Sequence, residues 1–187
     1  MIGITGKSGS GKSTLADILS KKLDCISVDV DKIGHKATSD EKISKQLVEI
    51  FGDKIVDNSG KINRKKLGNI VFSNQEKMDI LTNLTWGYME EKIDEIIKNE
   101  TKPIILEWAL LPISKFWKQC DTKIIMKADK KERKQKVILR DAITEEYFEK
   151  RDSKSLDYSN IKADFTFVNN YNEKTMEDFA NQILTFY

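Results

Sequence analysis

Short apolar runs alternate with longer amphipathic stretches along the 187-residue chain. The apolar runs predict strands, and they cover 1–5, 25–30, 104–111, 122–126 and 165–168. In the amphipathic stretches, apolar residues recur at three- and four-residue spacing, which predicts helices. These helices cover 12–23, 41–51, 76–98, 130–139, 144–150 and 173–186. Strands that alternate with helices predict a three-layer α/β fold with a parallel sheet of about five strands.

The interval 31–101 separates two predicted strands and is too long for a simple crossover connection. We expect a mostly helical lobe there, inserted into a core formed by 1–30 and 102–187. The chain has only 2 prolines and 9 glycines, which leaves little room for linkers. A single domain over 1–187 is therefore predicted, with the lobe as part of it.

Composition excludes several classes of protein. Hydrophobic residues make up 39%, enough for a core, and 32 basic against 30 acidic residues leave a net charge of +2. That balance argues against a nucleic-acid-coating protein. The longest run without a charged residue, 80–89, is far short of the ~20 residues of a membrane span, and Lys7 and Lys12 interrupt any secretory signal. Cys25 and Cys120 make neither a disulfide scaffold nor a zinc site. We expect a cytoplasmic protein, a monomer or a weak homo-oligomer, that binds neither nucleic acid nor membrane.

A phosphate-binding loop follows the first predicted strand. Residues 6–13 match the pattern G-x-x-x-x-G-K-[ST] without a mismatch. Glycines let successive backbone N–H groups point inward at phosphate oxygens, and the helix that follows adds partial positive charge. Lys12 is expected to reach the β- and γ-phosphates of ATP, and the Ser13 hydroxyl to bind Mg²⁺. The expected nucleotide-binding residues are Gly6, Lys7, Ser8, Gly9, Ser10, Gly11, Lys12, Ser13 and Thr14.

Two further segments imitate GTPase motifs. Residues 57–60 spell D-x-x-G, and Lys127 to Asp129 resemble the end of an N-K-x-D guanine-binding motif. Met126 stands where that motif needs asparagine, and a thioether cannot hydrogen-bond guanine as an amide does. Residues 57–60 also consist of ordinary turn formers, so we expect a polar turn there.

A small-molecule kinase fits the remaining polar residues better. Asp29 and Asp31 lie at the C-terminal end of the second predicted strand, and parallel strands deliver site residues at their carboxyl ends. A carboxylate there can take the proton of an acceptor hydroxyl, although the same residues can also cap a following helix. Arg140 is the leading candidate to hold the transferring phosphoryl group. Arg133, Lys136 and Arg151 are further candidates, and a solvated helix face is the alternative for this basic segment.

Glu107 interrupts the apolar run 104–111. A charged residue inside such a run has a structural or a catalytic task, because burying it without a partner is costly. Glu107 is therefore a candidate to contact a metal-bound water, or a residue that holds the metal.

Eight segments carry a resemblance that spans most of the chain: 4–14, Val28 to His35, 51–53, 60–67, Val71 to Asn74, 139–141, 163–164 and 169–170. In these segments the chain resembles the dephospho-CoA kinases, which phosphorylate the ribose 3′-hydroxyl of dephospho-CoA with ATP. The middle block is the most telling part, because many other families share the phosphate loop. It implies a P-loop kinase fold with a helical acceptor-binding lobe and a lid over 133–160. It also implies Asp31 as catalytic base, Arg140 as a phosphate-binding lid arginine and Asn169 near the ATP adenine.

Three positions depart from the family's pattern. Trp86-Gly87 stands where a His-Pro pair is usual, Ile113 replaces a glutamate, and Ser155 replaces a glutamine. All three belong to the acceptor or lid side, whereas the phosphate loop is intact. The sequence therefore supports ATP binding more strongly than it supports dephospho-CoA as the acceptor. Two alternatives stay open: a kinase of a nucleoside, nucleotide or other small molecule, and a non-catalytic ATP-binding relative. Trp86 and Trp108 either stack on a ligand or belong to the core, and no role is assigned to His35.

Overall fold

The computed structural model describes residues 1–71 and 74–186, so Phe72 and Ser73 of the family-like segment lie outside the described residues. The chain divides into two compact units. The first consists of Met1–Asp29 and Glu100–Tyr187, and the second is Val30–Asn99. Each unit has its own hydrophobic core.

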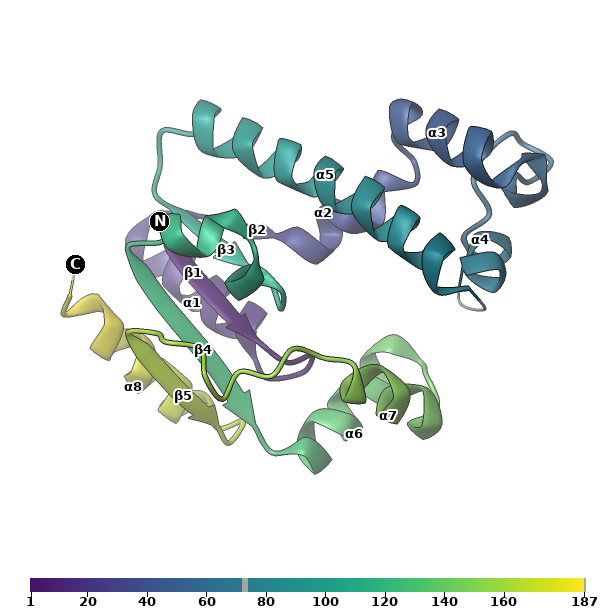
Figure 1. The fold of residues 1–187 in the computed structure, drawn as a ribbon. Helices are drawn as coiled ribbons and strands as arrows, with labels where there is room; N and C mark the ends of the chain where they lie inside the picture. Colours follow the sequence, from purple (N-terminus) through teal and green to yellow (C-terminus); the bar gives the residue numbers. More distant parts are fainter. Residues whose placement is uncertain (72–73, 187) are drawn as a thin grey trace. The chain divides into compact units, whose positions relative to one another are not determined.

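A five-stranded sheet forms the centre of the first unit (Figure 1). Its strands are β1 (Ile2–Gly6), β2 (Ile26–Asp29), β3 (Ile104–Glu107), β4 (Thr122–Ala128) and β5 (Phe165–Asn169). Their order across the sheet is β2-β3-β1-β4-β5, and every neighbouring pair is parallel. The predicted α/β fold with a five-stranded parallel sheet is confirmed.

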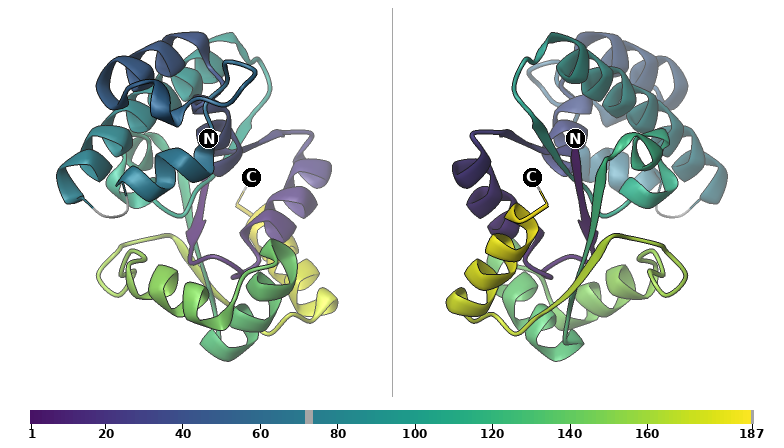
Figure 2. Two further views of the ribbon diagram at one scale, coloured as in Figure 1. Left: turned by 90° about the vertical axis from the view of Figure 1, so that its right-hand side faces the viewer. Right: turned by 90° about the vertical axis from the view of Figure 1, so that its left-hand side faces the viewer.

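Helices α1 (Lys12–Leu23) and α8 (Glu173–Leu184) pack together on one face of this sheet (Figure 2). Leu15 and Leu19 of α1 are completely buried against alternate residues of β1, such as Ile2 and Ile4. The four-residue repeat of the helix therefore meets the two-residue repeat of the strand, which is the pattern from which both elements were predicted.

Two predicted strands end earlier than expected. β2 stops at Asp29, and Val30 already begins a helix. The run 104–111 is a strand only as far as Glu107, which corrects the longer apolar segment expected there. Thr5 Oγ1 donates to the carbonyl oxygens of Trp108 (2.8 Å) and Ala109 (3.2 Å), so the chain turns across the end of β1. It continues into two short 3₁₀ helices, Leu111–Ile113 and Lys115–Gln119.

Two helices follow β4 in the first unit (Figure 1). They are α6 (Lys130–Asp141) and α7 (Glu145–Ser153). The segment 133–160 that resembles a lid contains all of α7 and most of α6. Asp129 caps α6 by accepting from the backbone N–H groups of Lys131 and Glu132. The helix ends where Ala142 adopts a left-handed conformation (φ 50°), which turns the chain toward α7.

The second unit is helical, as predicted for the inserted segment. It contains α2 (Val30–Ala37), α3 (Glu41–Phe51), α4 (Arg64–Val71) and α5 (Gln75–Asn99), with a 3₁₀ turn at Asp53–Ile55. The short helices α2 and α4 were not predicted as separate elements, because eight residues show barely two turns of periodicity. Its core is formed by Ile43, Leu47, Phe51, Ile55, Leu67 and Val71. Among the residues that the structure describes, no helix has the length and apolar character that crossing a membrane requires.

Candidate active site

The phosphate loop connects β1 to the N-terminus of α1. Lys12 is the first residue of the helix, and its side chain is buried, with Nζ 3.4 Å from the Lys7 carbonyl oxygen. Gly11 occupies the capping position with φ 93°, and the first helical turn contains no acidic residue. The helix itself therefore places no carboxylate on the partial positive charge of this end, which favours an anion.

Close packing around the loop explains two of its glycines. Gly9 has φ +81°, and a Cβ atom there would lie 2.8 Å from Val137 of α6. A Cβ atom on Gly11 would lie 2.3 Å from the side-chain nitrogen of Asn169. Both the left-handed backbone and the lack of space exclude other residues at these positions. The loop is thus fixed between α6 and the end of β5.

Asn169 and Tyr171 brace the loop from the C-terminal side. Asn169 is buried, and its Nδ2 donates to the Ser10 carbonyl oxygen at 3.0 Å, while its Oδ1 accepts from the Tyr171 backbone N–H at 2.8 Å. The Tyr171 hydroxyl donates to the Gly9 carbonyl oxygen at 2.8 Å. Asn169 therefore has a direct structural task at the loop, and its position near an adenine stays a prediction.

Arg133 braces the loop from α6. Its Nη1 donates to the Ser8 carbonyl oxygen at 3.2 Å and to Asp152 Oδ1 of α7 at 2.7 Å, and its Nη2 reaches Asp152 Oδ2 at 3.2 Å. The side chains of Arg133 and Asp152 are only 5% and 7% exposed. Burial by itself raises the pKa of the Asp152 carboxyl, but the hydrogen bond and charge of Arg133, with Lys7 and Lys130, outweigh it and hold the pKa below its usual value. The Arg133 guanidinium group is thus held in a buried ion pair with Asp152.

Ser13 and Glu107 meet at the carboxyl edge of the sheet. Ser13 Oγ donates to Glu107 Oε1 at 2.7 Å, and Glu107 is buried. Asp29 is the residue of β2 that pairs in register with Glu107, so this edge collects oxygen atoms beside the phosphate loop. Residues 1–71 and 74–186 contain no group of three His, Cys, Asp or Glu side chains able to hold a metal ion by themselves. Mg²⁺ suits this arrangement, because it takes few protein ligands and binds through waters and substrate phosphates.

Ser10 Oγ adds a second polar group inside the loop. It is fully buried and, among the described residues, has no hydrogen-bond partner. An unsatisfied buried hydroxyl is costly, so this atom is consistent with a site that a polar ligand completes.

The lid arginine expected from the resemblance lies against the phosphate loop. Arg140 is at the end of α6, and its Nη2 lies 3.2 Å from Ser8 Oγ. Lys136, another candidate cation, instead lies over the ring of Tyr171, with Nζ 4.4 Å from the ring centroid. The two basic residues therefore have different surroundings, although one helix carries both.

Other predicted site residues belong to the second unit. Asp31 is exposed in the first turn of α2, two residues after the end of β2, and His35 is exposed in the last turn of the same helix. Trp86 is half-buried in α5 and donates from its indole nitrogen to Glu90 at 3.1 Å. Trp108, in the first unit, is a core residue, with 1% of its surface exposed.

The GTPase-like segments have structural roles. Asp57 Oδ1 accepts from the backbone N–H groups of Ser59 (2.8 Å) and Lys61 (3.1 Å), and Gly60 has φ 81°. The polar turn predicted over 57–60 is confirmed. Asp129, at the end of the second segment, caps α6. Neither aspartate is therefore left to recognise a guanine nucleotide.

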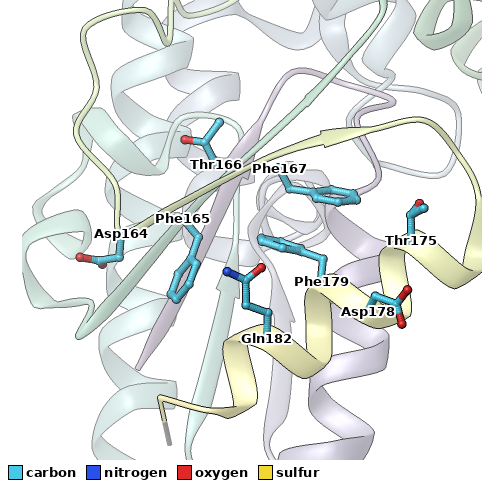
Figure 3. A pocket seen from close by; sticks show the side chains of 8 residues that line it. All are labelled: Asp164, Phe165, Thr166, Phe167, Thr175, Asp178, Phe179 and Gln182. Carbon is cyan, nitrogen blue, oxygen red and sulfur yellow. The ribbon is translucent and has the colours of Figure 1, made fainter.

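An open groove of about 540 Å³ lies beside β5 and α8 (Figure 3). Phe167 and Phe179 stack in it, with ring centroids 4.4 Å apart. Its charged lining residues are Asp164 and Asp178, with no lysine or arginine among them. The Asp164 carboxylate also accepts from the Lys123 backbone N–H at 2.7 Å. Two carboxylates repel a phosphate, so this groove is not the nucleotide site.

A second hollow, of about 380 Å³, lies within the helical unit. It is lined by α3, α5 and Asp40, with Gly87 on its α5 side. Apart from its chain neighbours and the backbone of its own helix, no atom of the described residues lies within 4 Å of the position that a Cβ of Gly87 would take. The hollow thus includes one of the positions where the chain departs from the family pattern.

Sequence reasoning did not identify Asp152, Tyr171 or Asn169's bond to the loop. Asp152 follows a run of charged residues on α7 and looks like part of a solvated face. Its burial depends on Arg133, 19 positions earlier. The sequence does place Arg133 on a basic helix and Asp152 on an acidic helix that follows after a short turn. That order suggests ion pairs between the two helices, but it does not say which pair is buried.

We expect replacement of Asp152 by alanine to lower the free energy of unfolding by about 3–5 kcal/mol, because it leaves the buried Arg133 guanidinium without its carboxylate. Urea unfolding of wild type and Asp152→Ala at pH 7 measures the difference in free energy of unfolding.

The pKa of Asp152 is lower in the folded state than its ordinary value of 3.8. The ion pair therefore stabilises the folded state fully above about pH 3.8, and this contribution is lost as the pH falls through the lower, folded pKa. Pairing Arg133→Met with Asp152→Leu removes both charges and is expected to restore much of the loss. A cost below about 1 kcal/mol, the range of an exposed pair, would contradict the buried ion pair.

Known proteins with a similar sequence or fold identify the family of this chain. The model of the dephospho-CoA kinase family matches residues 1–175. A dephospho-CoA kinase of Fusobacterium nucleatum is 33% identical over 189 residues, covering 100% of this chain and 96% of that protein. The structure of a dephospho-CoA kinase from Campylobacter jejuni has a TM-score of 0.65 and 26% identity, covering 98% of this chain and 95% of that one. A Thermus thermophilus protein shares the fold with a TM-score of 0.81 at 24% identity, over 98% of this chain and 95% of that one. With its phosphate loop intact and the family match running from residue 1 to residue 175, the chain belongs to the dephospho-CoA kinase family.

Proposed function

We propose that this protein transfers the γ-phosphoryl group of ATP to the ribose 3′-hydroxyl of dephospho-CoA, releasing ADP and CoA. The observation that carries the proposal is an intact phosphate loop within a chain matched by the dephospho-CoA kinase family model over 1–175. In the transfer, the 3′-oxygen bonds to the γ-phosphorus, and the bond from that phosphorus to the bridging oxygen of ADP breaks. The proton of the hydroxyl goes to a base on the protein.

Residues of the first unit hold the triphosphate. Lys12 and the backbone N–H groups of the loop bind the β- and γ-phosphates, and Arg140 balances the charge of the transferring group. Ser13 would hold Mg²⁺, and Glu107 would hold the Ser13 hydroxyl or a metal-bound water. When bound, Mg²⁺ supplies charge neutralisation on the phosphates. The 2.7 Å bond between Ser13 Oγ and Glu107 supports this pairing of roles.

Asp31 is the proposed base, on the resemblance and on its place in the chain. It follows β2 by two residues, and β2 ends at the same edge of the sheet as β1 and β3. The acceptor is assigned to the helical unit on the resemblance alone.

Purified protein with Mg²⁺-ATP tests the function directly. ADP release and product mass are followed with dephospho-CoA and, separately, with nucleosides, nucleotides and small sugars. We expect one added phosphoryl group on dephospho-CoA and at most background release with the other acceptors. Turnover of a different acceptor would contradict the proposed substrate but keep the kinase chemistry. ATP binding without ADP release under any condition would contradict the proposed activity altogether.

A further inference from the structure

Two arginines from different helices converge on one hydroxyl group of the phosphate loop. Arg140 Nη2 at the end of α6 and Arg151 Nη2 on α7 each lie 3.2 Å from Ser8 Oγ. The two guanidinium groups therefore lie side by side at the loop, although 10 positions separate Arg151 from Asp141, the neighbour of Arg140. Bringing two positive charges together is unfavourable unless negative charge offsets them.

Asp141 supplies part of that negative charge and connects the pair. Its Oδ1 accepts from Arg140 Nε at 2.7 Å, and its Oδ2 accepts from Arg140 Nη2 at 3.1 Å and from Arg151 Nη1 at 3.0 Å. The two arginines share this one carboxylate. The three side chains together thus keep a net charge of +1 beside a loop that already contains Lys7 and Lys12.

Burial distinguishes this cluster from the other ion pair at the loop. Arg133 and Asp152 are 5% and 7% exposed, whereas the side chains of Arg140 and Arg151 are 57% and 47% exposed and that of Asp141 is 24% exposed. Exposed ion pairs contribute little to stability. The contact of Arg151 with the loop is therefore better explained by binding than by folding.

We propose that Arg151 is a second phosphate-binding arginine, which forms with Arg140 a pair directed at the terminal phosphoryl group of the bound nucleotide. Asp141 is the residue that positions the pair. This inference rests on the proposed function only in taking ATP as the phosphoryl donor. Planar guanidinium groups bind phosphate oxygens through two parallel hydrogen bonds, so two of them side by side suit a group with three terminal oxygens. The pair accordingly favours a nucleoside triphosphate over a diphosphate.

The test compares the affinities of Arg151→Ala and wild type for Mg²⁺ with β,γ-imido-ATP and for Mg²⁺ with ADP, by titration calorimetry. We expect Arg151→Ala to weaken imido-ATP binding about tenfold or more and to leave ADP binding within about twofold, since a charge-assisted bond to the terminal group is lost. Arg151→Lys keeps the charge without the planar fork and is expected to recover part of the loss. Lys150→Ala, which removes an exposed charge from the neighbouring position on α7, is the matched control.

The role of Asp141 has a separate readout. We expect Asp141→Asn to weaken imido-ATP binding less than Arg151→Ala does, with little change in melting temperature. In the Arg151→Ala background the same substitution should have a smaller effect, because residues that act through each other are not additive. Equal effects in both backgrounds would overturn the positioning role.

Three results would overturn the arginine pair: unchanged imido-ATP affinity in Arg151→Ala, an equal loss for imido-ATP and ADP, or the same change in Lys150→Ala. These results are independent of the acceptor. If wild type fails to phosphorylate dephospho-CoA but prefers imido-ATP and loses that preference with Arg151→Ala, the proposed function fails while the pair stands. If dephospho-CoA is phosphorylated and the nucleotide preference does not change, the pair fails while the function stands.

Discussion

Replacing Lys12 by alanine is expected to reduce turnover by about 10²–10³-fold, the effect of removing one preorganised group that stabilises charge in a transition state. Lys12 begins α1, and its ammonium group is held inside the loop, 3.4 Å from the Lys7 carbonyl oxygen. Its charge is therefore already in place before the phosphoryl group moves. Steady-state rates of ADP release with dephospho-CoA measure the effect.

Lys21→Ala is the matched control for this variant. Lys21 is an exposed lysine in the last turn of the same helix, so its loss changes the net charge equally but leaves the loop intact. We expect the control to retain wild-type turnover. Melting temperatures of both variants separate a loss of chemistry from a loss of folding. Turnover of Lys12→Ala within tenfold of the control would mean that the loop does not hold the reacting phosphates.

Asp31→Asn is expected to lower kcat by about 10²–10⁴-fold, the usual contribution of a general base, while ATP affinity changes little. Asparagine has almost the same shape as aspartate but cannot take a proton from the acceptor hydroxyl. Asp31 is exposed in the first turn of α2, so the substitution buries no new polar group and the fold should tolerate it. The measurement is kcat with dephospho-CoA, together with the dissociation constant for β,γ-imido-ATP.

Asp29→Asn tests whether Asp29, rather than Asp31, is the base. Asp29 ends β2 opposite Glu107, so it also lies at the carboxyl edge of the sheet. If Asp31 is the base, kcat falls further in Asp31→Asn than in Asp29→Asn. The opposite order would assign the proton transfer to Asp29, and a wild-type kcat in Asp31→Asn would exclude Asp31. A parallel loss of ATP affinity and kcat would indicate metal or nucleotide binding instead.

Much of the fold was predictable because its signals are local. Leu15 and Leu19 recur at helical spacing, and Ile2 and Ile4 alternate along a strand, so each segment carries its own periodicity. The same holds for the inserted helical segment, whose α3 and α5 agree closely with the predicted ranges. The predicted end of β3 was wrong for a tertiary reason, because Thr5 of a different strand donates to the carbonyl oxygens of Trp108 and Ala109, where the chain leaves the sheet. The predicted end of β2 was one residue too long, since α2 already begins at Val30.

The sequence by itself determined the class of this protein and the identity of its phosphate loop, because glycines, lysine and serine must follow one another at fixed spacing to surround a phosphate. Only the tertiary structure decided what holds that loop. Asn169 bonds to Ser10, 159 positions away, and Arg151 reaches Ser8, 143 positions away. No local pattern records such pairs, since each depends on which helix faces which loop after the sheet has formed. The same limit applies to Arg133 and Arg140, two similar residues of one helix. Arg133 is buried in its ion pair with Asp152, whereas Arg140 stays more than half exposed in its ion pair with Asp141.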